Sequence, residues 1–285
     1  MSETAPEHQK DVVLVRRDEN MPSVAIMTMN RPDAMNSFNV AVFLRMMELF
    51  AELEADKTVR VIVLTGEGRA FCAGADISDG FGSAGLDYKA ERVDGVPRDT
   101  GGVLNLAIAK LDIPVIAAIN GAAVGIGLTM TLPCDIRIAA SKTKYAFPFT
   151  RRGIVFDGAA SFYLPKLVGF SKATQWSLTG SYIDPEDGLR SGLFSELHDR
   201  DDVMPRALEL ARDIAVNCSP ESVTQNKKLL RATMMGHGAL ASEPFAAHMA
   251  ESELLEKAFV SPDCVEGVRA FLEKRSPRFA DRQSS

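Results

Sequence analysis

A single carboxylate, Asp157, lies in the weakly polar stretch RRGIVFDGAASFYLP, residues 151–165. An acid in such a stretch either faces water in a turn or is placed to move a proton. Because DGAASFYL has a helical pattern directly after the acid, capping of that helix by Asp157 is one interpretation. The apolar neighbours Ile154–Phe156 and Phe149 support the other, since they would raise the pKa of the carboxyl group toward that of a useful base.

Two glycine-containing turns, FCAGAD and GAAVGIG, each follow a predicted strand, and we expect each to lead into a helix. The first N–H groups of a helix have no partner within it, and the helix N-terminus carries a partial positive charge. Two such N–H groups aimed at one point would polarise a carbonyl group and stabilise an oxyanion. Small residues also let a strand and a helix pack closely, so the turns by themselves leave both interpretations open.

Several other site types lack their residues in this chain. VGIGLTM offers GxG but has Met130 in place of the third glycine of a dinucleotide-binding loop, and neither GxxxxGKS nor GxxxxGKT occurs. There is no GxSxG, and the histidines lie in polar or C-terminal segments, at His8, His198, His237 and His248. The four cysteines are far apart and form no CxxC, so we predict neither a metal site nor a disulfide framework.

Charge and hydropathy narrow the possible partners and compartment. The formal charge of −6 and the pI of about 5.4 argue against nucleic-acid and anionic-membrane partners. The uncharged run at residues 113–134 contains two prolines and an asparagine and has acidic borders, which argues against a membrane span. Free cysteines favour a reducing compartment, and we expect a cytoplasmic protein. Residues 1–10 are polar and are expected to form a disordered leader.

Strand-like and helix-like segments alternate, which predicts an α/β core with parallel strands followed by C-terminal helices. Residues 79–101, rich in glycine and aspartate, are expected to form a mobile loop with a short helix near a site. The predicted strands are 12–16, 24–29, 59–66, 114–120 and 135–140, the first two of them as a hairpin. The predicted helices are 38–56, 103–111, 128–132, 161–167, 171–179, 185–191, 204–217, 220–235, 242–259 and 264–274.

Four segments occur in an order and spacing that resemble the crotonase family, the enoyl-CoA hydratases and isomerases. They are NRPDAMNSF, VRVIVLTGEGRAFCAGADI, IPVIAAINGAAVGIGLTMTLPCDIRIAA and LPKLVG with the following LTG, and the match covers residues 12–197 and extends more weakly to the end. The resemblance implies a spiral of ββα units, C-terminal helices that form a trimer or a dimer of trimers, and an acyl-CoA thioester substrate. Coenzyme A then enters only as part of the substrate. The expected organisation is a leader (1–10), the core (11–197), a C-terminal helical region (198–279) and a polar tail (280–285).

The resemblance also assigns site residues. It implies that the backbone N–H groups of Ala75 and Ile126 form the oxyanion hole. It implies substrate and coenzyme A contacts along the two turns, the loop before the first long helix and the segment near Phe149. These contacts involve Ala34, Met35, Ala73, Gly74, Asp76, Ile77, Val124, Gly125, Thr129, Pro148 and Phe149.

Hydratases of this family use two glutamates, and this chain has Thr129 and Phe149 at those positions. Neither side chain can serve as a base at neutral pH without help. Asp157 matches the single proton-shuttling acid of the 3,2-enoyl-CoA isomerases, so we predict an isomerase, although aspartate is one methylene shorter than the usual glutamate. Weak hydration, thioester hydrolysis, decarboxylation and non-catalytic acyl-CoA binding are the alternatives. Three interpretations stay open for Arg151 and Arg152: an ion pair with Asp157, binding of coenzyme A phosphates, and exposure to solvent.

Overall fold

A computed structural model describes residues 11–77, 92–235 and 243–282 of the chain. Its larger sheet has six strands in the order β1-β2-β3-β7-β9-β12. The pair β1-β2 is antiparallel, as the predicted hairpin requires, and the other neighbouring strands are parallel. The strands are β1 (Val13–Arg17), β2 (Val24–Met29), β3 (Val61–Gly66), β7 (Val115–Ile119), β9 (Ile136–Ala140) and β12 (Glu196–His198).

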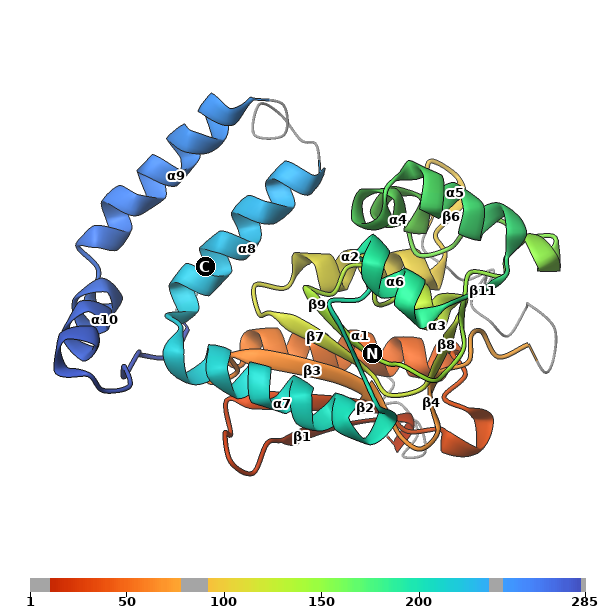
Figure 1. Ribbon diagram of the computed structural model, residues 1–285, viewed down its shortest axis with the longest axis horizontal. Coiled ribbons are helices and arrows are strands. Elements are labelled where there is room, and N and C mark those ends of the chain that lie inside the picture. Colours follow the sequence, from red (N-terminus) through yellow and green to blue (C-terminus); the bar gives the residue numbers. More distant parts are fainter. Residues whose placement is uncertain (1–10, 78–91, 236–242, 283–285) are drawn as a thin grey trace.

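Helices cover both faces of this sheet (Figure 1). Side chains alternate between the faces of a strand, so residues of β3 such as Ile62 and Val63 belong to different clusters of buried side chains. Ile62 packs in the cluster that contains α1 (Val40–Ala55) and α2 (Thr100–Lys110). Val63 packs in the cluster that contains α7 (Arg200–Asn217). Because both faces are buried, the strands are continuous apolar runs, which is why the sequence reveals them.

A smaller sheet, which the sequence does not predict, lies beside the larger one. Its order is β11-β10-β8-β4, and β4, β8 and β10 run parallel to one another. The strands are β4 (Ala70–Cys72), β8 (Ala122–Val124), β10 (Tyr145–Ala146) and β11 (Tyr182–Ile183). Strands of two or three residues carry no readable periodicity, and only their pairing in the folded chain defines them.

The remaining segments of the core confirm most predicted helices and correct some boundaries. The helix expected at 103–111 is α2 and begins at Thr100, and the helix expected at 128–132 is α3 (Ile126–Thr129). Within the predicted loop 79–101, residues 78–91 lie outside the described part, and 92–97 form the hairpin of β5 (Arg92–Val93) and β6 (Val96–Pro97) instead of a helix. The other core helices are α4 (Ala160–Val168), α5 (Phe170–Thr179) and α6 (Pro185–Ser191).

Three C-terminal helices, α8 (Pro220–Met235), α9 (Pro244–Phe259) and α10 (Pro262–Glu273), extend away from the α/β body (Figure 1). Ion pairs tie α8 to the body, since Lys227 and Arg231 each lie 2.9 Å from Asp135. The chain then returns to the body beyond α10, where the buried Arg282 donates to backbone carbonyl groups of Glu54, Asp56 and Val59. Of the helices in the described ranges, none is long and apolar enough to cross a lipid bilayer.

Candidate active site

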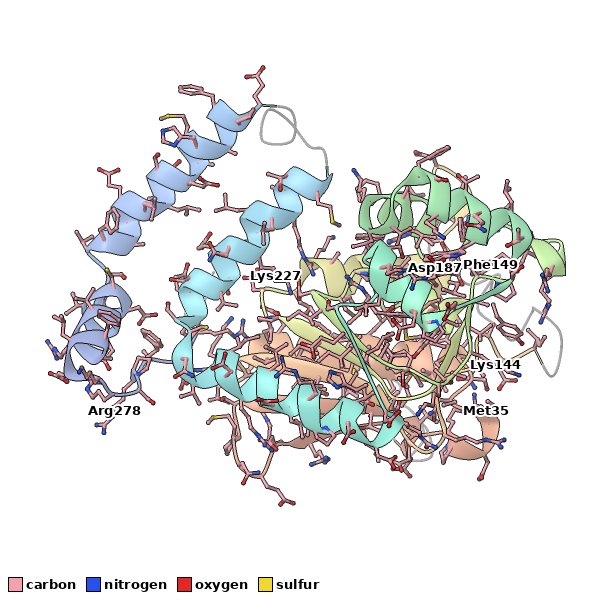
Figure 2. All side chains as sticks on the ribbon, viewed as in Figure 1. Met35, Lys144, Phe149, Asp187, Lys227 and Arg278 are labelled. Atoms are coloured by element: carbon pink, nitrogen blue, oxygen red, sulfur yellow. The ribbon has the colours of Figure 1, made fainter. Side chains whose placement is uncertain are left out.

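The smaller sheet brings together segments that are distant in the sequence. Its strands β4, β8 and β10 are parallel neighbours, so their carboxyl ends meet at one edge, where parallel sheets place their sites. Ala75 follows β4, Ile126 follows β8, and Phe149 follows β10. Figure 2 shows Phe149 on the side of the molecule away from α9 and α10.

The N–H groups of Ala75 and Ile126 are available to a ligand. Ala75 forms a parallel bridge with Phe38, in which the flanking Gly74 carbonyl and Asp76 amide bond to Phe38. The N–H of Ala75 therefore points away from Phe38. Ile126 is the first residue of α3, whose N–H has no partner within the helix. Neither N–H donates to an acceptor among the described residues.

The local backbone explains why the second turn needs its glycines. Gly125 has φ 56° and ψ −126°, a combination that residues with a side chain rarely adopt. A Cβ at Gly127 would lie 2.1 Å from the carbonyl oxygen of Cys72, so only glycine lets α3 approach β4. The first turn contains the bridge at Ala75, and the helix expected after it falls on residues 78–91, which lie outside the described part.

Asp157 is held by a side chain and does not cap the following helix. The hydroxyl group of Thr129 donates a hydrogen bond of 2.6 Å to Oδ1 of Asp157. Helix α4 has Ala159 at its N-cap, in the left-handed conformation and without a side-chain cap, so the capping interpretation of Asp157 is wrong. The start of α4 is separated from Asp157 because the two residues between them, Gly158 and Ala159, both have positive φ.

The environment of Asp157 makes its carboxyl group a weaker acid than usual. Burial is the main cause and raises the pKa from 3.8 to about 6. The hydrogen bond from Thr129 acts in the opposite direction because it favours the ionised form, and the charge of Asp99 raises the pKa further. A carboxylate with a pKa near 6 is ionised at neutral pH and is a stronger base than a solvent-exposed aspartate.

Ala75, Ile126 and Asp157 line one cavity of about 630 Å³. Most of the lining is apolar, and the rings of Phe149 and Phe156 meet edge to face with centroids 5.5 Å apart. Arg152 and Asp99 contribute charge. The predicted site residues that line the cavity are Ala73, Gly74, Ala75, Ile77, Val124, Gly125, Ile126, Pro148, Phe149 and Asp157.

Four predicted residues do not line this cavity. Thr129 is fully buried behind Asp157. The side chain of Asp76 lies 2.9 Å from Arg31 in an ion pair. Ala34 and Met35 lie in or just after a short 3-10 helix, Pro32–Ala34, and the carbonyl group of Met35 accepts a hydrogen bond of 3.0 Å from the N–H of Ala73. That bond places the Ala34–Met35 loop against the start of the first turn.

The two arginines next to the site have different surroundings. Arg151 donates to the carbonyl group of Thr179 and to the hydroxyl group of Ser181. Arg152 lines the cavity. Among the described residues, the side chain of Asp157 is bonded by Thr129 and forms no ion pair with either arginine.

Sequence reasoning missed Asp99, a second acid on the cavity wall. It lies at the N-cap of α2, where its side chain accepts a hydrogen bond from the N–H of Gly102. The spacing of DTGG before an apolar helix predicts a cap, but nothing in the sequence places that cap beside Asp157. No group of His, Cys, Asp or Glu side chains able to hold a metal ion is found among the described residues.

Comparison with known proteins identifies the family to which this arrangement belongs. A family model described as Enoyl-CoA hydratase/isomerase matches residues 19–282. The chain belongs to the enoyl-CoA hydratase/isomerase family. Its α/β fold is accordingly the crotonase fold, and solved members of the family superpose on nearly the whole chain.

Two relatives and one structure illustrate the range of this family. The chain is 44% identical over 259 residues to "Enoyl-CoA hydratase ACTT3" of Alternaria alternata, covering 90% of this chain and 83% of that protein. It is 32% identical to "1,2-epoxyphenylacetyl-CoA isomerase" of Escherichia coli K12, covering 91% and 95%. The crystal structure of a "probable enoyl-CoA hydratase/isomerase" from Mycobacterium abscessus has a TM-score of 0.83 and 34% identity, covering 95% and 100%.

Membership of the enoyl-CoA hydratase/isomerase family makes this chain an acyl-CoA-processing enzyme. The family name covers both addition of water and movement of a double bond. One relative is named a hydratase and another an isomerase of an epoxide, at similar coverage of this chain, so these names do not select the reaction of this protein.

Proposed function

We propose that this protein is an enoyl-CoA isomerase that converts 3-enoyl-CoA to 2-enoyl-CoA, with Asp157 as the proton carrier. The observation that carries the proposal is the position of Asp157, which lines the same cavity as Ala75 and Ile126. The positions of the two hydratase glutamates hold Thr129 and Phe149, and neither of them ionises near neutral pH.

The proposed reaction needs one acid and two N–H groups. The thioester oxygen accepts hydrogen bonds from the N–H groups of Ala75 and Ile126, which lowers the pKa of the protons on C2. Ionised Asp157 takes a proton from C2, and the N–H groups stabilise the dienolate. Neutral Asp157 then returns the proton to C4. The raised pKa of about 6 suits both steps, because Asp157 must gain and lose the same proton at neutral pH.

The remaining contacts with the substrate are proposed from their positions. The turn around Ala73–Ile77 and the Ala34–Met35 loop are joined by the hydrogen bond between Ala73 and Met35, and together they would bind the adenine of coenzyme A. Val124, Gly125 and Pro148 would line the path of the thioester, and Asp76 would hold the first turn through Arg31. We further propose that the exposed apolar side chains of α9 and α10 form contacts in a trimer or a dimer of trimers.

Absorbance of the conjugated 2-enoyl thioester, followed during incubation with a 3-enoyl-CoA, tests the proposal. The wild-type protein should form the product, and Asp157→Asn should reduce kcat by about 100-fold or more. Asp184→Asn is a matched control, because Asp184 caps α6, is exposed and does not line the cavity. Equal rates for wild type and Asp157→Asn would refute the role of Asp157.

Hydration is the second candidate, because the relative at 44% identity is named a hydratase. The two reactions are separated by product analysis. Incubation with a 2-enoyl-CoA should give little 3-hydroxyacyl-CoA if the isomerase proposal is right. Formation of 3-hydroxyacyl-CoA as the main product, with no shift of the double bond in 3-enoyl-CoA, would favour hydration.

A further inference from the structure

Asp99 faces the catalytic cavity but has no part in the proposed proton transfer. It belongs to the segment before α2, whereas Asp157 lies between η4 (Thr150–Arg152) and α4, so the two acids reach the cavity from different elements. Oδ1 of Asp99 accepts two backbone hydrogen bonds, one of 2.5 Å from the N–H of Gly102 and one of 3.2 Å from the N–H of Gly158. Asp99 therefore joins α2 to the residue that directly follows Asp157.

Helix α2 holds the peptide groups of Gly158 from both sides. Asp99 accepts from the Gly158 N–H, and the fully buried Asn105 donates a hydrogen bond of 2.6 Å to the Gly158 carbonyl group. The same amide of Asn105 donates to the carbonyl group of Thr129, whose hydroxyl group binds Asp157. Gly158 and Ala159 have φ of 63° and 53°, and such a backbone persists only where its surroundings hold it.

Among the described residues, three groups besides Thr129 bear on the charge of Asp157. Asp99 lies on the wall before α2, Arg152 lies on the wall in η4, and Cys72 of β4 lies near enough to interact with the Asp157 charge. Burial raises the pKa of the Cys72 thiol to about 12, so Cys72 stays neutral. Asp99 thus supplies the negative charge that acts on Asp157, in the same direction as burial and against the hydrogen bond from Thr129.

We propose that Asp99 is a positioning residue for Asp157, which holds the Asp157–Gly158 turn through the Gly158 N–H and places its negative charge on the same cavity wall as the Asp157 carboxyl group. The inference rests on the proposed function, in which Asp157 carries the proton. Asp99 itself transfers no proton in this scheme. Its carboxylate acts on the substrate only through Asp157.

The direct test is a titration of the Asp157 carboxyl carbon by ¹³C NMR in protein labelled at aspartate, with Asp157→Asn used to assign the resonance. Asp99→Asn keeps the oxygen that accepts both hydrogen bonds and removes the charge, and Asp99→Ser keeps a capping oxygen without the charge. In both variants the pKa of Asp157 should fall by about half a unit or more. Asp184→Asn removes a capping charge at a residue that does not line the cavity, and it should leave the pKa of Asp157 unchanged.

The pH dependence of kcat/KM gives a second readout. The rise of kcat/KM with pH reports ionisation of Asp157, so in Asp99→Asn it should move to lower pH, with a fall of about threefold on the plateau because the base is weaker. If Asp99 had a merely structural role, its variants would have a lower melting temperature and a lower plateau of kcat/KM, but the pH at which kcat/KM rises would not change. An unchanged pKa of Asp157 in both Asp99 variants would overturn the proposal. Loss of turnover as complete as in Asp157→Asn, at every pH, would overturn it in favour of proton transfer by Asp99.

The titration also separates this inference from the proposed function. If Asp157→Asn isomerises 3-enoyl-CoA as fast as wild type, the proposed function fails whatever the titration shows. If Asp157→Asn is inactive and the Asp157 pKa does not respond to Asp99, the isomerase proposal stands and the role of Asp99 fails.

Discussion

The hydroxyl group of Thr129 lies 2.6 Å from Oδ1 of Asp157 and donates a hydrogen bond to it. The resemblance to the hydratases matches Thr129 with one of their glutamates, and here its side chain binds the carboxylate of Asp157. One carboxylate oxygen of Asp157 is thereby fixed, and the proposed mechanism assigns the substrate proton to the other oxygen.

Thr129→Val should therefore change the acidity of Asp157. Valine keeps the shape of threonine but donates no hydrogen bond, and the lost bond favoured the ionised form, so the pKa of Asp157 should rise above 6 by about one unit. The rise of kcat/KM with pH should move to higher pH by the same amount. Thr129→Ser keeps the donor and should follow the wild-type profile. Superimposable profiles for Thr129→Val and wild type would show that the hydrogen bond has no effect on the base.

Asp157→Asn should stabilise the protein at neutral pH while it removes activity. The folded-state pKa of about 6 exceeds the unfolded value of 3.8, so the ionised carboxylate destabilises the fold increasingly from pH 3.8 to 6 and fully above that range. At pH 8 the variant should unfold at higher urea concentration, with a gain on the order of 2 kcal/mol. The gain should shrink as the pH falls toward 3.8. A stability difference that does not depend on pH would contradict the raised pKa.

Gly127→Ala should destabilise the fold more than a glycine substitution on the surface. A Cβ at Gly127 would lie 2.1 Å from the backbone oxygen of Cys72. Movement of β4 or α3 away from this contact would disrupt their packing against neighbouring elements. We expect a loss of about 2–3 kcal/mol from such overpacking. Gly153→Ala, at φ 69° with no atom within 4 Å of the new methyl group, should cost about 1 kcal/mol. Urea unfolding of both variants measures the difference, and equal midpoints would mean that the contact relaxes.

Arg282→Ala should weaken the attachment of the C-terminal segment. The guanidinium group is buried and donates to the Val59, Glu54 and Asp56 carbonyl groups and to the Glu54 carboxylate. Its loss leaves buried acceptors unpaired and should cost about 2 kcal/mol or more. Arg282→Lys should recover only part of this, because an ammonium group cannot reach all four acceptors. Urea unfolding checks both values, and a wild-type midpoint for Arg282→Ala would show that the segment contributes nothing to stability.

Long apolar segments were predictable from the sequence because their periodicity is local. The strands β2, β3, β7 and β9 and the helices α1 and α5 lie where their patterns indicate. The smaller sheet was not predictable, since β4, β8 and β10 have at most three residues each and exist through pairing with one another. The edge that carries the site is therefore formed by the elements with the weakest sequence signal.

Candidate site residues that belong to sequence motifs were predictable, whereas residues that reach the site only through packing were not. The resemblance led to Ala75, Ile126 and Asp157, which line one cavity. The interpretation that Asp157 caps α4 was wrong because the positive φ of Gly158 and Ala159 separates Asp157 from the helix. No sequence pattern indicates that backbone conformation. Asp99 was missed because its place beside Asp157 depends on how α2 packs against the Gly158 turn.

The proposed polarising N–H groups and the proposed proton carrier differ in how they tolerate mutation. The groups available at Ala75 and Ile126 are backbone N–H groups, which every amino acid except proline possesses. Drift of side chains at these two positions can reshape the cavity while the proposed polarising groups persist. The proposed proton carrier depends on one side chain, Asp157, and a single codon change removes it. Under relaxed selection the chain would therefore lose the proposed proton transfer long before it lost the N–H groups proposed to polarise a thioester.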